Sequence, residues 1–108
     1  MSNINQAIQL AAEIEVQDGS TVSKTLHQDD GLKIVLFGFA AGQELSEHTA
    51  AVPAIMHFLE GEADVTVGET KSAATANTFY HMEANMPHSI TARQPTKMLL
   101  TLLKACKK

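Results

Sequence analysis

The chain has 108 residues, which is enough for one globular domain and too few for two. Hydrophobic residues make up 44% of it and charged residues 19%, and the net charge of −4 is spread along the chain. This composition lacks the basic face or stripe that nucleic-acid binders carry, so we expect no nucleic-acid partner.

The ends of the chain contain no obvious targeting or membrane segment. Gln6, Gln9 and Glu13 interrupt any apolar run near the start, and no stretch approaches the roughly 20 apolar residues of a membrane span. The single cysteine, Cys106, cannot form an internal disulfide, and its place in an apolar run favours a packed thiol. These features predict a cytoplasmic protein with no membrane partner.

Residues 1–18 are expected to form an N-terminal arm with one short helix over residues 3–15. Apolar residues recur there at helical spacing, and Asn3 is suited to the N-cap. The apolar positions are Ile4, Ile8, Ala11 and Ala12. The turn-forming residues at 18–20 then end the arm.

Residues 20–106 predict a series of short β-strands separated by turns. The strands are expected over 21–27, 32–39, 54–59, 62–67, 78–82, 88–93 and 97–105. Ala63, Val65 and Val67 alternate with polar residues, which is typical of a strand with one buried face. Many short strands with closely spaced turns indicate a sandwich or barrel, so the sequence predicts a single all-β domain.

Two segments of this domain carry a recognisable pattern. Gly42, His48 and Gly61 are spaced as in the first motif of the cupin superfamily, G-x5-H-x-H-x3,4-E-x6-G, and the sequence from Ala84 to Ser89, ANMPHS, resembles the common form of its second motif. The chain therefore resembles a small single-domain cupin of the RmlC-like, conserved-barrel type. The resemblance implies a double-stranded β-helix, or jelly-roll barrel, and places His88 at the last metal-binding histidine.

The sequence departs from the family pattern at two of its four metal ligands. Ala50 stands where the second histidine is expected, and Ala54 stands where the glutamate is expected. Zinc, iron and manganese sites usually hold three or four protein ligands. His48 and His88 are thus a two-histidine remnant, and a divalent iron, manganese, nickel or zinc ion needs further donors to complete the site.

Strand parity suggests which other residues accompany the histidines. If residues 44–48 form a regular strand, Glu44 shares a face with His48, which makes Glu44 the candidate third metal ligand. His88 is expected to point into the barrel, and His57 to point out of it. Two choices stay open. Met56 and Phe58 form either the floor of a pocket or part of the core. In the strand over 78–82, the inward pair is either Phe79 with His81 or Tyr80 with Met82. The candidate ligand-binding residues are Glu44, His48, Met56, Phe58, His81 and His88.

Two functions compete on this basis. The first is a small-molecule-binding barrel with a degenerate metal site, in which apolar residues have replaced ligand chemistry. The alternative is a metal-dependent cupin enzyme, of the dioxygenase or isomerase class, with a rebuilt His/Glu site. No catalytic residue can be assigned, and a metal-free general-base histidine is a third option. We favour the binding module. Metal content distinguishes the two hypotheses, because a binding module should purify without metal and an enzyme should carry near-stoichiometric metal.

We also expect a homodimer. The runs at 32–39 and 98–103 are apolar on both parities, as in strands that are covered on both faces. A barrel of this size has little with which to cover the outer face, apart from the N-terminal arm, and small cupins commonly pair.

Overall fold

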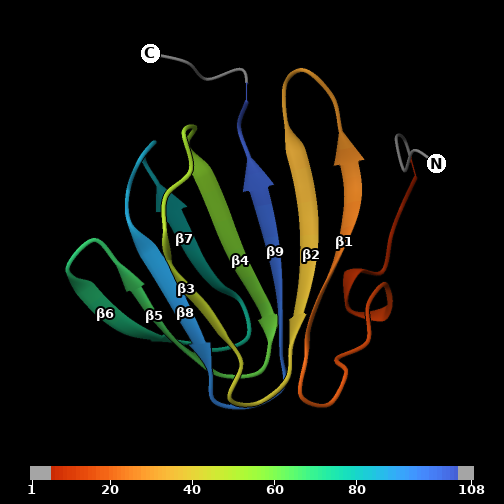
Figure 1. Ribbon diagram of the computed structural model, residues 1–108. Coiled ribbons are helices and arrows are strands. Elements are labelled where there is room, and N and C mark those ends of the chain that lie inside the picture. The colour runs from red at the N-terminus through yellow and green to blue at the C-terminus, as the bar shows by residue number, and fades with distance from the viewer. Residues whose placement is uncertain (1–5, 105–108) are drawn as a thin grey trace.

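A computed structural model describes residues 6–104, which form nine β-strands in two antiparallel sheets (Figure 1). The five-stranded sheet has the order β1-β2-β9-β4-β7, and the four-stranded sheet has the order β3-β8-β5-β6. The strands are β1 (Thr21–Gln28), β2 (Lys33–Phe39), β3 (Glu44–His48), β4 (Ala54–Glu60), β5 (Ala63–Val67), β6 (Thr70–Ala74), β7 (Thr78–Met82), β8 (His88–Ala92) and β9 (Thr96–Leu102). The predicted all-β fold is therefore confirmed.

The core lies between the two sheets and follows from the alternation along each strand. Ala63 and Val65 are fully buried there, as predicted, whereas Asp64 between them is exposed. The inward residues of the two sheets form one cluster of mostly aliphatic and methionine side chains. Its buried members are Phe39, Ala54, Met56, Phe58, Ala63, Val65, Ala74, Met82, Ile90, Ala92 and Met98.

The N-terminal arm differs from the prediction. The expected helix is wrong within the described residues, because only one turn of 3-10 helix forms, η1 (Leu10–Ala12). Ile14 is buried against Leu26 and Leu36 on the outside of the five-stranded sheet, and Leu10 packs on the same cluster. Packing against this flat surface, rather than helical periodicity, thus determines the arm's path. Asn3, Ile4 and Cys106 lie outside the described residues.

Strand β6 (Thr70–Ala74) was not predicted. It pairs only with β5, and its first four residues are exposed. A polar edge strand has no clear period-two pattern, which is why the sequence did not reveal it. Among residues 6–104, no helix is long and apolar enough to cross a membrane.

Two glycines of the cupin pattern occupy turns that only glycine adopts easily. Gly42 and Gly61 have φ values of +87° and +99°. A Cβ on Gly61 would lie 2.3 Å from the carbonyl oxygen of Pro95, whereas one on Gly42 would meet nothing within 4 Å. The turn before β5 therefore fits closely beneath the start of β9.

Candidate functional site

His48 and His88 face each other across two adjacent strands. His48 ends β3, His88 begins β8, and the two residues are direct cross-strand partners. Their ring centroids lie 4.2 Å apart with the planes inclined by 59°. The structure thus brings together the two histidines that the cupin motifs predict.

The backbone holds both imidazoles by the same kind of hydrogen bond. His48 Nδ1 lies 2.9 Å from the carbonyl oxygen of Ser46, and His88 Nδ1 lies 2.9 Å from that of Met86. A carbonyl oxygen only accepts hydrogen bonds, so each Nδ1 must carry the proton. In the neutral ring each Nε2 then has a free lone pair, which can accept a hydrogen bond or bind a metal.

His88 is buried, with 5% of its surface exposed, whereas His48 is exposed. Burial lowers the pKa of His88 below its ordinary value, and the charge of His48 lowers it further, while the hydrogen bond to the Met86 carbonyl opposes the shift. Every fully buried side-chain nitrogen or oxygen of the described residues has a hydrogen-bond partner. His88 Nε2 has no hydrogen-bond partner among the described residues, so this atom must be accessible at the surface.

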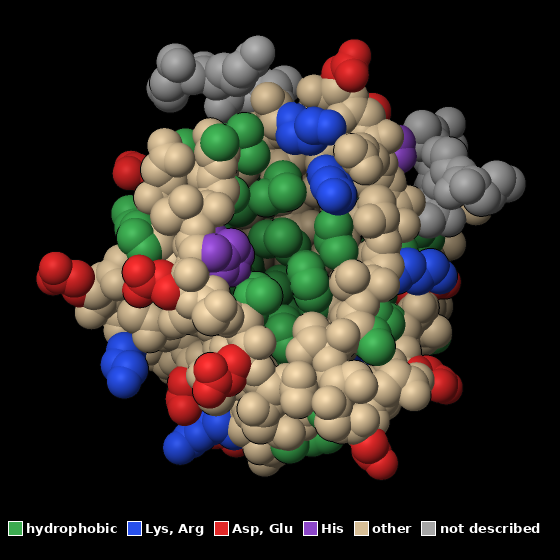
Figure 2. Space-filling model, in the orientation of Figure 1, with side chains coloured by type: hydrophobic (Ala, Val, Ile, Leu, Met, Phe, Trp, Pro, Cys, Tyr) green, Lys and Arg blue, Asp and Glu red, His purple; other side chains and the backbone are tan. Residues whose placement is uncertain are grey.

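Figure 2 shows a hollow in one face of the molecule. Hydrophobic side chains line its floor and a histidine stands at its edge. Leu45, Val67, Met86, Leu100 and Leu102 are partly buried and pack on the core. Val67 and His48 are the two cross-strand partners of His88. His88 therefore has an apolar neighbour on β5 and a polar neighbour on β3.

Glu44 does not share the face of His48, and the expectation that it does is wrong. Leu45 pairs with Ile90, and the next pair is His48 with His88, so β3 has one residue more than β8 in this interval. This β-bulge reverses the parity between the two parts of β3. Glu44 is exposed and opposite Thr91, on the outside of the sheet.

His81 also lies outside the barrel. Its cross-strand partner is Ile55, and it is exposed, whereas Met82 on the other face is buried and Tyr80 packs on the core. Of the two alternatives left open, Tyr80 and Met82 are the inward pair. His81 and Glu83 instead line a separate surface pocket of about 370 Å³ beside Pro53.

Met56 and Phe58 belong to the core. Each is 1% exposed, so neither forms the surface of an open hollow. Phe58 packs edge-on against the ring of Tyr80, whose hydroxyl lies 2.7 Å from Ser72 Oγ on β6. Tyr80 therefore links the two sheets, a role that the sequence analysis did not assign.

Lys33 is a second residue that the sequence analysis missed. It begins β2 and pairs with Leu102, and its parity is that of Phe37 and Phe39, which face the core. Both Lys33 and His88 begin strands that start at the same end of the barrel (Figure 1). Lys33 has no acidic partner among the described residues, and parity with Phe37 would have identified its inward position.

The side chains at this site do not complete the four-ligand metal site of the cupin motifs. Two imidazole nitrogens are present, but Ala50 and Ala54 supply no donor and Glu44 lies on the outer face. No group of three or more histidine, cysteine, aspartate or glutamate side chains suited to a metal occurs among residues 6–104. Tight transition-metal sites usually need three protein ligands.

Comparison with solved structures identifies the class of protein that this barrel and its inward histidines define. A cupin superfamily protein from Desulfitobacterium hafniense is 29% identical over 92% of this chain and 91% of that one, with a TM-score of 0.85. A conserved protein of unknown function from Streptococcus pyogenes is 27% identical, with 93% and 88% of the two chains covered and a TM-score of 0.84.

A third similar structure is a cupin 2 conserved barrel domain protein from Leptotrichia buccalis. It is 32% identical over 90% of this chain with a TM-score of 0.84, and the match covers 47% of that longer protein. No protein-family model matches the sequence, and no similar curated protein was found. The chain thus has the cupin fold, and solved structures of cupin and RmlC-like cupin proteins match it at TM-scores of up to 0.85.

Proposed function

We propose that the barrel binds a small organic acid, without a tightly held metal. The observation that carries the proposal is the His48–His88 pair, in which backbone carbonyls fix both rings so that each Nε2 remains free at the open end of an apolar barrel. Apolar pockets with a few convergent polar groups are the usual form of small-molecule sites.

The chemistry of the hollow suggests the shape of the ligand. An apolar body would contact Leu45, Leu100 and Leu102, which are only partly buried. Neutral histidines accept hydrogen bonds through Nε2, which favours a hydroxyl or N–H group on the ligand. Lys33, at the same end and without an acidic partner among the described residues, is suited to a carboxylate. A hydroxy acid or amino acid with an apolar side chain combines these groups.

The metal-dependent enzyme is the weaker alternative because the site offers too few metal-ligating side chains. It would need a third protein ligand, and the described residues near the pair supply none. Metal analysis of the freshly purified, untagged protein tests it directly. Near-stoichiometric transition metal that disappears in the His48→Ala/His88→Ala variant would overturn the metal-free proposal.

Thermal-shift and calorimetric titrations with a panel of aliphatic and aromatic hydroxy and amino acids test ligand binding. A ligand at about 100 times its Kd is expected to stabilise the wild type by about 2.7 kcal/mol. The stabilisation should be lost in His88→Gln and strongly reduced in Lys33→Met. A panel without any hit, or equal binding by wild type and His88→Gln, would contradict the proposal.

Matched variants separate a local effect from a general one. His57 lies on the opposite face of the same sheet, because its partner Leu99 belongs to the outer cluster, so His57→Gln should bind the ligand normally. Lys71 is exposed on the edge strand β6, which makes Lys71→Met the control for loss of a positive charge. If Lys71→Met weakens binding as much as Lys33→Met does, net charge and not Lys33 is responsible.

A further inference from the structure

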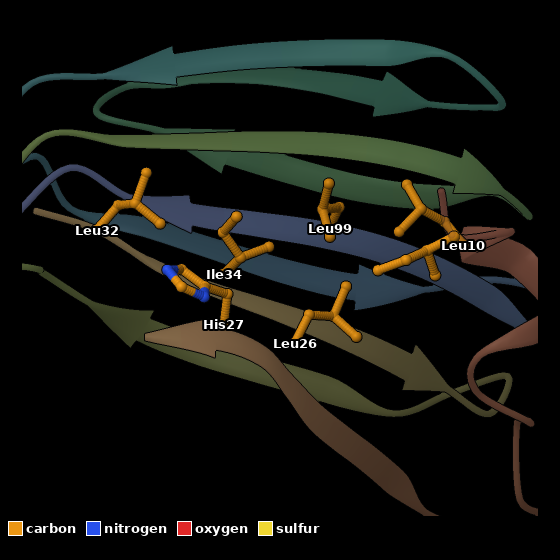
Figure 3. A pocket seen from close by; sticks show the side chains of 7 residues that line it. Leu10, Leu26, His27, Leu32, Ile34 and Leu99 are labelled. Carbon is orange, nitrogen blue, oxygen red and sulfur yellow. The ribbon is translucent and has the colours of Figure 1, made fainter. Parts of the chain in front are cut away.

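A groove lies on the outer face of the five-stranded sheet, on the side opposite the histidine hollow (Figure 3). Its volume of about 350 Å³ is at the lower end of the range for small-molecule sites. Figure 3 shows the imidazole of His27 at one end, beside Leu32, and Leu10 at the other end. The lining is aliphatic apart from that imidazole: Ile8, Leu10, Leu26, His27, Leu32, Ile34 and Leu99. The groove therefore has an apolar body and one polar end.

A β-bulge in β1 brings His27 to this groove. Thr25 pairs with Val35 and His27 pairs with Ile34, so β1 has one residue more than β2 in this interval. The bulge places Leu26 and His27 on the same face, although regular alternation would put neighbouring residues on opposite faces. Leu26 is buried in the outer cluster, and His27 lies beside it at the edge of the groove.

Asp29 holds the ring of His27 in place. Its Oδ2 lies 2.7 Å from His27 Nε2, and its Oδ1 accepts hydrogen bonds from the backbone N–H groups of Gly31 and Leu32 at 2.7 and 3.0 Å. The hydrogen bond with His27, followed by the two from the backbone, lowers the pKa of Asp29 to about 2. An ionised carboxylate only accepts, so Nε2 must carry a proton. Nδ1 is thus the ring nitrogen that remains for a ligand.

A lysine ammonium lies at the same end of the groove. Lys104 Nζ donates a hydrogen bond to the main-chain carbonyl oxygen of Asp29 at 2.9 Å. Within residues 6–104 it forms no ion pair with an acidic side chain. An ammonium has further N–H donors, which stay available for a ligand. The polar end therefore offers a positive charge that no carboxylate of the described chain neutralises.

We propose that this outer groove binds a straight-chain fatty carboxylate, with its head group at Lys104 and His27 and its hydrocarbon chain along the aliphatic lining. A negative head group complements the ammonium of Lys104, whereas an alkyl amine would meet a like charge. The rest of the lining has no polar side chain with which to recognise a polar body. The proposed ligand therefore matches both parts of the groove.

The length of the groove indicates the length of the chain. Leu10 packs on the outer cluster that contains Leu36, and the span from Leu32 to Leu36 is about 13 Å at about 3.3 Å per residue. A zigzag of C–C bonds of about 1.5 Å covers this span with roughly ten carbons. Decanoate should therefore fill the groove.

Calorimetric titration of the full chain with octanoate and decanoate, below the concentrations at which they form micelles, tests the proposal. Decanoate should bind about 4- to 15-fold more tightly than octanoate, because two more methylenes leave water. Leu10→Ser should remove this difference, since Leu10 lines the end of the groove that the longer chain reaches. If Leu10→Ser loses structure by circular dichroism, Ile8→Ser replaces it, because Ile8 also lines the groove.

The head group is tested by Lys104→Met. This variant should weaken octanoate binding about fivefold and leave the binding of 1-octanol unchanged, because only the carboxylate pairs with the ammonium. Lys71→Met is the matched control for the loss of a positive charge, since Lys71 is exposed on β6 of the other sheet. It should bind both ligands like the wild type.

His88→Gln separates this proposal from the ligand site in the hollow. The variant removes a histidine of the hollow and should bind decanoate normally, so the two proposals can fail independently. Loss of decanoate binding in His88→Gln would overturn the groove proposal and place the chain in the hollow. The groove proposal also fails if decanoate shows no saturable binding, as when a second copy of the chain fills the groove. Equal affinities for decanoate and decylamine, or equal effects of Lys104→Met and Lys71→Met, would refute the assigned head-group site.

Discussion

Replacing Gly61 with alanine is expected to destabilise the barrel by about 3 to 5 kcal/mol. The new Cβ would lie 2.3 Å from the carbonyl oxygen of Pro95 and 2.5 Å from both Cα and Oγ1 of Thr96. Because two of these atoms are backbone, no side-chain rotation relieves the overlap. A non-glycine residue at φ +99° adds of order 1–3 kcal/mol, and displacing the start of β9 adds a similar amount.

Thr96 makes the displacement more costly. It is fully buried, and its hydroxyl donates a hydrogen bond to the carbonyl oxygen of Gln94 at 2.7 Å, with the carbonyl of Glu62 a second acceptor at 3.2 Å. Any shift that makes room for a methyl group at position 61 also disturbs this buried hydroxyl. Leaving it unsatisfied would cost about 1–3 kcal/mol.

Urea unfolding followed by circular dichroism measures the effect, with Gly42→Ala as the control. Gly42 has a similar left-handed backbone, φ +87°, but open space around it, so its replacement should cost only the backbone strain, about 1–2 kcal/mol. The difference between the two variants isolates the overlap with β9. An equal loss of stability in both would refute the reasoning, because it would mean that the turn relaxes freely.

Three further predictions concern the site and the link between the sheets. Burial lowers the pKa of His88 in the folded chain. In the unfolded chain the same imidazole takes up a proton near its ordinary pKa of 6.5, whereas in the folded chain it does so only at lower pH. Stability should therefore fall as the pH drops from about 7 to about 5, and fall less in His88→Gln, as urea titrations at both pH values would show. Tyr80→Phe removes the hydrogen bond to Ser72 and should cost about 1 kcal/mol in the same assay. Ala50→His combined with Ala54→Glu should tighten zinc binding at least about 100-fold by calorimetry, and unchanged affinity would contradict the donor count.

Much of the fold could be predicted because its strands alternate clearly and its motif glycines mark the turns. His88 was expected to face inward from parity alone, and it is buried. The polar strand β6 escaped prediction because an edge strand with an exposed surface needs no hydrophobic pattern. The arm was misjudged because tertiary packing overrode helical spacing, and Ala11 and Ala12 are exposed.

The side chains around the histidines were harder to predict, and the reason is the bulge in β3. Counting by twos from His48 puts Glu44 on the same face, which is correct only for a regular strand. The extra residue between Leu45 and His48 depends on how β3 pairs with β8, which lies some 40 residues further along the chain. The sequence of β3 alone does not determine this pairing. The same bulge brings both Leu45 and His48 to the inner face, so it creates the apolar and polar parts of the hollow together.

The two faces of β9 explain why the sequence of this strand is apolar on both parities. Met98 is buried in the core and Leu100 packs on it, whereas Leu99 packs on the outer cluster and Thr101 lies on the same outer face. Neighbouring residues are therefore expected to serve different tasks. A polar substitution at Leu100 should weaken ligand binding, and one at Thr101 should leave it unchanged, as calorimetric titration would show. If both substitutions weakened ligand binding equally, the sheet would transmit changes between its two faces.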